Sequence, residues 1–304
     1  MFAQPLSGKT HSAKDYLYII GSVALGLFLL PTLLFSAAQE FAPQATIGLQ
    51  LLVGALWLSL FHLATKGNFA FSRPDWLRLI AMSLLGITVY RVLSRYALTI
   101  AVSHSLSNLA VLIVLATLPV LVSILYIVLR RHALTTWGWL AALVSVSGVL
   151  LTLGTFHPGI SRDTIFLSLA AAFALAGYTV LAESLLERYS ALKIAATSTL
   201  LGAVPIFALS LGSVVQNGWV EIGTPSWRWL TQGLYIALSY LVWNYAVRRV
   251  GGLRTTIYAN LAGVVSGYLF FLTLSPLAGI AGITLLIISV FLLRRQIVGT
   301  QGAG

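Results

Sequence analysis

The segment SLSNLAVLIVLATLPVLVSILYIVL, residues 105–129, contains no charged side chain and is followed directly by Arg130 and Arg131. The hydrocarbon core of a bilayer is crossed by a helix of about 20 apolar residues. A membrane β-strand would instead alternate between apolar and polar residues over about ten positions, and this segment does not alternate. The segment therefore predicts a transmembrane α-helix that ends at a pair of arginines.

Nine further segments of the chain meet the same length requirement. The ten predicted spans cover residues 16–38, 45–65, 76–99, 105–129, 134–154, 164–186, 194–214, 229–247, 255–274 and 277–293. The first span is longer than the apolar region of a secretory signal, which runs for about 7–15 residues, so we expect it to be retained. We expect an all-α integral membrane protein with ten transmembrane helices.

The composition agrees with a membrane protein and excludes an ordinary soluble one. Hydrophobic residues make up 59% of the 304 residues and charged residues 8%, and the mean hydropathy is +0.94. A soluble domain has about 25% charged residues. The net charge of +11 comes from basic residues that stand singly or in pairs between apolar runs, which favours a membrane over nucleic acid as the partner. The chain has no cysteine, which excludes disulfides and thiolate metal sites.

The basic residues also predict an orientation. With a cytoplasmic N-terminus, the cytoplasmic segments carry fourteen of the 18 Lys and Arg residues: Lys9, Lys14, Lys66, Arg73, Arg78, Arg130, Arg131, Arg188, Lys193, Arg248, Arg249, Arg254, Arg294 and Arg295. Outside segments carry Arg162 and Arg228, and Arg91 and Arg95 lie within the third span. Positive charge concentrates on the cytoplasmic side of membrane proteins, so we expect both termini in the cytoplasm.

Short sequence echoes indicate an internal repeat. LLVGA at 51–55 matches TLLGA at 199–203, SRYAL at 94–98 matches WNYAV at 243–247, and PVLVS at 119–123 matches GVVSG at 263–267. Five spans are an odd number, so the second copy enters the membrane from the opposite side. The expected organisation is a cytoplasmic tail at 1–15, a five-helix repeat at 16–154, an inverted repeat at 164–293 and a cytoplasmic tail at 294–304.

The chain resembles the drug/metabolite transporter superfamily, in its ten-helix EamA branch. The resemblance rests on YAL at 96–98, LPV at 118–120, YLVWNYAV at 240–247 and YANL at 258–261. Relatives often have Gly-Glu after the fourth and ninth helices, where this chain has LRR at 129–131 and TLS at 273–275. The resemblance implies a bacterial inner-membrane transporter of small metabolites such as amino acids, working by export or exchange. It also implies a central cavity lined mainly by the third, fourth, eighth and ninth helices.

Two arginines within the third span are the strongest site candidates. Arg91 and Arg95 are four residues apart and project from one helix face. The repeat offset pairs them with Tyr240 and Asn244, so we expect all four around one cavity. A guanidinium matches a carboxylate bidentately, which predicts that the pair binds the anionic end of a substrate. The alternative is an internal salt bridge to Glu183, the one acid within a span, which cannot neutralise both arginines.

The remaining polar residues within spans have two interpretations each. Glu183 either carries a coupling proton, if it is buried, or lies near the cytoplasmic end, about a turn from Arg188, as a plain interfacial charge. The other candidate substrate-binding residues, each of which could serve helix packing instead, are Asn108, Tyr178, Trp243, Tyr258 and Asn260. Prolines within spans, which act either as hinges or as static kinks, are Pro31, Pro119 and Pro205.

These features together predict a secondary transporter of a carboxylate-bearing small metabolite, working by alternating access as a monomer or homodimer. The expected partners are a small-molecule substrate and membrane lipid, with no nucleic acid, no cofactor and no metal. A receptor or scaffold without transport is the alternative. An integral membrane enzyme is disfavoured because the sequence offers no catalytic spacing of acids, histidines or nucleophiles.

Overall fold

The computed structural model describes residues 43–103, 107–130, 134–152, 161–217, 226–271 and 276–301, and all regular structure within these ranges is helical. The elements are α2 (Pro43–Ala64), α3 (Arg73–Ser83), η1 (Leu84–Val89), α4 (Tyr90–Ser103), α5 (Ser107–Leu125), η2 (Tyr126–Arg130), α6 (Thr136–Thr152), α7 (Arg162–Leu186), α8 (Ala191–Asn217), α9 (Ser226–Val250), α10 (Gly252–Phe271) and α11 (Pro276–Gln301). The predicted span 16–38, with Pro31, lies outside the described residues.

The helical prediction is confirmed for the other nine segments. Elements α3, η1 and α4 follow one another without a break, as do α5 and η2, and each predicted segment overlaps one such rod. The largest difference is at α11, which continues to Gln301 beyond the predicted end at residue 293. Hydropathy measures apolar length, whereas backbone hydrogen bonding continues wherever no residue breaks the helix.

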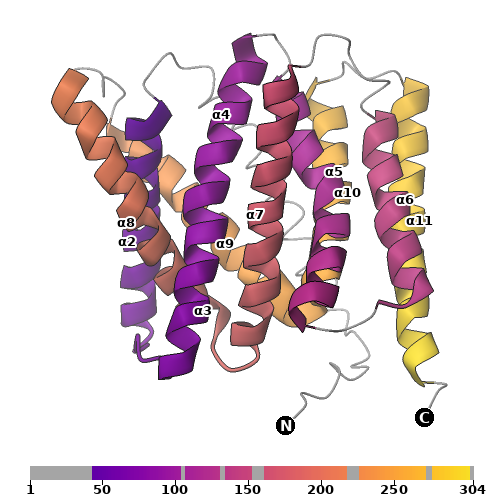
Figure 1. Cartoon of the computed structure of the whole chain (residues 1–304), viewed down its shortest axis with the longest axis horizontal. Helices are drawn as coiled ribbons and strands as arrows, with labels where there is room; N and C mark the ends of the chain where they lie inside the picture. The colour runs from indigo at the N-terminus through magenta and orange to yellow at the C-terminus, as the bar shows by residue number, and fades with distance from the viewer. Residues whose placement is uncertain are drawn as a thin grey trace.

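The helices lie side by side in a slab (Figure 1). Helices α2 and α8 pack together at one edge, α6 and α11 pack together at the other, and α7 lies between, against α4 and α5. Helix α5 also packs against α10. The three pairs α2–α8, α5–α10 and α6–α11 each join the helices that the predicted sequence repeat makes equivalent.

Glycines set the closest helix contact at the α6–α11 edge. A Cβ atom built on Gly148 would lie 2.9 Å from the carbonyl oxygen of Gly282, and one built on Gly282 would lie 2.6 Å from the carbonyl oxygen of Gly148. The two backbones therefore touch directly. Small residues at such crossings are typical of helices that associate without a hydrophobic driving force from water.

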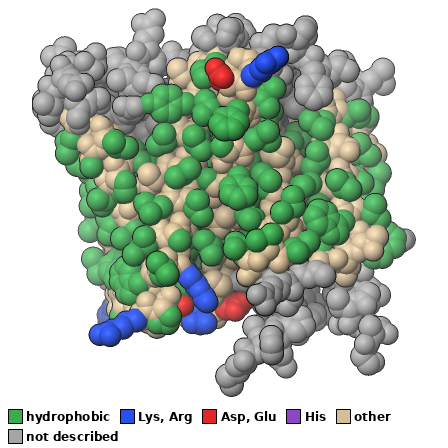
Figure 2. All heavy atoms as spheres, in the orientation of Figure 1, with side chains coloured by type: hydrophobic (Ala, Val, Ile, Leu, Met, Phe, Trp, Pro, Cys, Tyr) green, Lys and Arg blue, Asp and Glu red, His purple; other side chains and the backbone are tan. Residues whose placement is uncertain are grey.

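The surface of the slab is apolar between its two ends. Figure 2 shows hydrophobic side chains across the middle of this face, with Lys, Arg, Asp and Glu at the upper and lower margins. Leu77 and Phe166 are 75% and 71% exposed. Among the described residues, three helices are long and apolar enough to cross a membrane, at Arg73–Ala101, Arg162–Leu186 and Ala191–Leu211.

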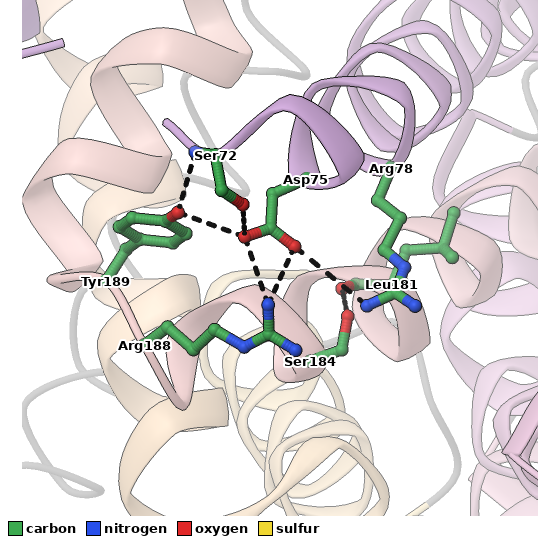
Figure 3. A network of polar contacts seen from close by, with 7 residues as sticks. All are labelled: Ser72, Asp75, Arg78, Leu181, Ser184, Arg188 and Tyr189. Atoms are coloured by element: carbon green, nitrogen blue, oxygen red, sulfur yellow. Dashed lines mark hydrogen bonds and ion pairs between the residues drawn. The ribbon is translucent and has the colours of Figure 1, made fainter. Parts of the chain in front are cut away.

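The connections α2–α3 and α7–α8 meet at one end of the slab around a buried carboxylate (Figure 3). Asp75 is 1% exposed. It accepts hydrogen bonds from Arg188 Nη1 at 3.1 Å, Tyr189 Oη at 3.0 Å and Ser72 Oγ at 2.5 Å. We call this the basic end, because the two connections and the first turns of α3 and α8 here carry Lys66, Arg73, Arg188 and Lys193.

Candidate functional site

A π-helical turn interrupts the third predicted span. In η1 the backbone hydrogen bonds widen, and the N–H of Tyr90 donates to the carbonyl of Leu85. Gly86 allows η1 to pack closely against α7, because a Cβ there would lie 2.2 Å from the ring of Tyr178 on α7. The Thr88 hydroxyl donates to the carbonyl of Gly202 on α8 at 2.9 Å. Single π turns within α-helices are frequent at functional sites.

Arg91 follows this turn directly and is held by aromatic groups. Its Nε donates to the hydroxyl of Tyr240 at 3.3 Å. Its Cζ lies 5.3 Å from the ring centroid of Tyr240 and 5.8 Å from that of Tyr90, within the range of cation–π attraction. No carboxylate of the described residues forms a salt bridge with Arg91, and the predicted alternative of an Arg91–Glu183 pair is not formed.

Tyr240 fixes the position of Arg91 against the π turn. Its side chain is 4% exposed, and its hydroxyl donates to the carbonyl of Gly86 at 2.8 Å while accepting from Arg91. Its ring meets that of Tyr178 edge to face, with centroids 5.8 Å apart. The hydroxyl is therefore engaged both as donor and as acceptor, so Tyr240 serves to position the guanidinium.

One turn further along α9, Asn244 joins this group to α7. Its Nδ2 donates to the hydroxyl of Tyr178 at 2.6 Å and to the carbonyl of Tyr240 at 2.8 Å. The carbonyl contact fixes which amide atom is nitrogen, and Oδ1 accepts no hydrogen bond from the described residues although it is buried. The neighbouring Trp243 Nε1 donates to Thr179 Oγ1 at 3.2 Å. Helix α9 is thus fastened to α7 by two consecutive residues.

The structure brings four predicted site residues into one connected set: Arg91, Tyr240, Asn244 and Tyr178. The contact between Arg91 and Tyr240 joins positions separated by 149 residues, the offset that the repeat predicts. A contact between two equivalent positions is expected where a two-fold axis passes between them. Trp243 lies beside this set through Thr179.

The other predicted residues lie on neighbouring turns and helices or outside the described side chains. Asn260 of α10 donates to Ser145 Oγ of α6 at 2.8 Å, and its contacts do not reach Arg91. Arg95 and Tyr258 are half-buried on α4 and α10. Pro119 and Pro205 lie within α5 and α8, which continue through them. The side chain of Asn108 lies outside the described ones.

Glu183 lies towards the basic end of α7, buried against the turn between α9 and α10. The hydroxyl of Tyr126 donates to its Oε2. A Cβ built on Gly251 or Gly252 would lie 3.4 Å from a carboxylate oxygen of Glu183. Glu183 is 7% exposed and lies five residues before Arg188.

Sequence reasoning missed Gly86 and Tyr126. Gly86 carried a signal, because it is a glycine in the middle of a predicted span, five residues before an arginine of the same span. Tyr126 carried none, because nothing in an apolar run marks which tyrosine meets a distant carboxylate. Among the described residues, no group of three or more His, Asp and Glu side chains is placed to hold a metal ion.

Comparisons with known proteins establish the fold alone. No protein-family model and no curated protein matches the chain. A solved structure described only as "Crystal structure of protein" matches with a TM-score of 0.69 and 17% sequence identity, over 93% of this chain and 98% of that chain. At this identity the likeness shows that the two chains share an overall helical architecture.

Proposed function

We propose that the protein is a membrane transporter of the drug/metabolite transporter type that moves a small carboxylate-bearing metabolite by alternating access. The observation that carries the proposal is Arg91, a guanidinium near the middle of a long apolar helix that aromatic groups hold and no carboxylate of the described residues neutralises. Placing a charge at such a depth costs about 2.5–3.5 kcal/mol on insertion scales, so a charge there indicates function by default.

The geometry around Arg91 favours a carboxylate as its ligand. Tyr240 occupies Nε, and the two terminal nitrogens make no hydrogen bond to the described residues. These two nitrogens form the fork that a carboxylate binds with two parallel hydrogen bonds. A neutral solute would satisfy the donors less well and would leave the charge uncompensated.

The packing of the helices supports two inverted repeats around this site. The helices that the repeat makes equivalent pack against each other in three pairs, and Arg91 contacts its own equivalent, Tyr240. Two similar halves in opposite orientation can exchange conformations, which exposes a central site to each side in turn. The proposal places the basic end and both chain termini in the cytoplasm of a bacterial cell, following the distribution of Lys and Arg.

Counterflow in proteoliposomes tests the proposal. Purified protein, preloaded liposomes and a panel of radiolabelled amino acids and organic acids are used. We expect at least one carboxylate to exchange, and Arg91→Ala to lower its apparent affinity by about 10- to 100-fold, because hydrogen bonds to charged groups contribute about 1.5–3 kcal/mol. Arg78→Ala is the matched control, since Arg78 is half exposed at the basic end.

The carboxamide of the exchanging solute sharpens the test. The unmodified protein should discriminate strongly between the acid and its carboxamide, and Arg91→Ala should bind both equally weakly. The carboxylate assignment is wrong if Arg91→Ala leaves affinity for the acid unchanged. Absence of exchange by any member of the panel, together with stoichiometric co-purification of a second protein, would favour a scaffold instead.

A further inference from the structure

Three elements meet at one hydroxyl group near the basic end. Tyr126 is the first residue of η2, Glu183 belongs to the last turns of α7, and Gly252 is the first residue of α10. The hydroxyl of Tyr126 donates to Glu183 Oε2 and accepts from the backbone N–H of Gly252 at 3.1 Å. We call these three residues the Tyr126 hub.

The hub places negative charge at the start of a helix. The first N–H groups of an α-helix have no partner within the helix, and the aligned peptide dipoles make that end positive. Gly251 has a φ of +87°, a left-handed conformation that glycine adopts without strain, and it turns the chain from α9 into α10. Glu183, acting through Tyr126, thus caps α10 from a different helix.

The α9–α10 turn lies so close to Tyr126 and Glu183 that Gly252 has no room for a side chain. A Cβ on Gly252 would lie 2.7 Å from Tyr126 Oη and 3.4 Å from Glu183 Oε2. Any side chain there would push the α9–α10 turn away from α7 and η2. The contact therefore depends on the backbone of the turn lying directly against the hub.

A row of contacts runs along α9 and ends at the hub, at the first residue of α10. Starting at the site, Arg91 meets Tyr240, and Tyr240 donates to Gly86. Asn244 then meets Tyr178, and Trp243 meets Thr179. The row ends where Gly252 meets Tyr126. Helix α9 is therefore fastened to the rod of η1 and α4 and to α7 from the Arg91 site down to the basic end.

We propose that the Tyr126 hub is a latch that closes the basic end beneath the Arg91 site. When the hub breaks, the α9–α10 turn separates from α7 and η2, and the lower part of the row becomes accessible from the basic end. This inference rests on the proposed transport function for its biological meaning, but its physical content is a closed contact that does not require a transported solute.

A cysteine-labelling experiment tests the latch. The chain has no native cysteine, so Val250→Cys provides a single probe next to the turn, at a position that is 7% exposed. The protein is placed in lipid nanodiscs, where both ends are open to a water-soluble maleimide. Lys66→Cys, in an exposed turn at the same end, gives the labelling rate of an open position.

Tyr126→Phe keeps the ring and removes both hydrogen bonds of the hub. We expect labelling of Val250→Cys to become about tenfold faster, the shift in equilibrium that follows loss of one charge-assisted hydrogen bond. Glu183→Gln retains an acceptor but loses the charge and should give a smaller increase. Tyr235→Phe, on α9, is the matched control, since the hydroxyl of Tyr235 makes no hydrogen bond to the described residues.

The latch is overturned if both Tyr126→Phe and Glu183→Gln leave the labelling rate of Val250→Cys unchanged while the protein stays monodisperse and Lys66→Cys labels normally. Equally faster labelling of Val250→Cys in the Tyr235→Phe control would indicate general loosening and would also overturn it. Because no solute is added, labelling can support the latch even if counterflow fails, and counterflow can succeed even if labelling excludes the latch.

Discussion

The rod from α3 through α4 and the helix α9 occupy paired places in the predicted sequence repeat but are built differently. The first is interrupted by the π turn η1 and carries Arg91 and Arg95, whereas α9 is a continuous α-helix with Tyr240 and Asn244 at the paired positions. The charge lies on one helix and the groups that orient it lie on the other. The contact between Arg91 and Tyr240 thus needs one residue from each of the two helices that the predicted repeat pairs.

The largest expected effect comes from filling the π turn. Gly86→Val would place its Cβ 2.2 Å from the ring of Tyr178, which is fully buried. Overpacking of this kind costs about 1–3 kcal/mol and sometimes more, so we expect a large loss of folded protein in size-exclusion and thermal-unfolding measurements.

The position in α9 that the predicted repeat pairs with Gly86 needs no glycine. Tyr235, 149 residues after Gly86, is a large and half-buried residue in a regular helix. Gly177→Ala serves as the control on α7, because its new Cβ would meet only the terminal Cδ1 of Leu85 at 3.0 Å. If Gly86→Val unfolds at the same temperature as the unmodified protein, the π turn is not packed as described.

Exchanging Arg91 and Tyr240 tests whether the guanidinium can be carried by α9 and the phenol by α4. Tyr240→Arg alone places a second guanidinium against Arg91, and we expect counterflow to fall by about tenfold or more, because like charges in contact repel in a low-dielectric site. Combining it with Arg91→Tyr restores one guanidinium and one phenol across the same contact. Counterflow of the double variant should exceed that of Tyr240→Arg, and equal or lower activity would show that the site depends on the π turn as well as on the pair.

The smallest expected effect concerns the anchor of the π turn. Thr88→Val removes the hydroxyl that donates to Gly202, and a neutral hydrogen bond contributes about 0.5–1.5 kcal/mol. A fall of a few degrees in thermal unfolding is therefore expected. The paired residue in α9, Ala237, has no hydroxyl, and Ala237→Ser is not expected to stabilise α9 because no widened turn needs an anchor there.

Sequence reasoning reached most of the helical architecture because each helix is a continuous apolar run, and length alone identifies such runs. It also brought Arg91 and Tyr240 together, since a repeat offset converts a sequence distance into a spatial contact. It did not predict the π turn η1, because a change in the backbone hydrogen-bond pattern leaves the hydropathy of the segment unchanged. It did not find the role of Asp75 either, because a carboxylate at a predicted helix start does not reveal partners more than a hundred positions away.

The carboxylate of Asp75 sets an order of events during synthesis. Arg188, which binds it, follows 113 residues later in the chain. Until the ribosome has delivered that segment, the nearby partners of Asp75 are Ser72 and Arg78, whose Nη1 lies 4.0 Å from Asp75 Oδ1. We therefore expect the α2–α3 connection to take its final place only after Arg188 and Tyr189 have been added, and co-expression of two pieces divided between Asp75 and Arg188 should recover material that the first piece alone does not yield.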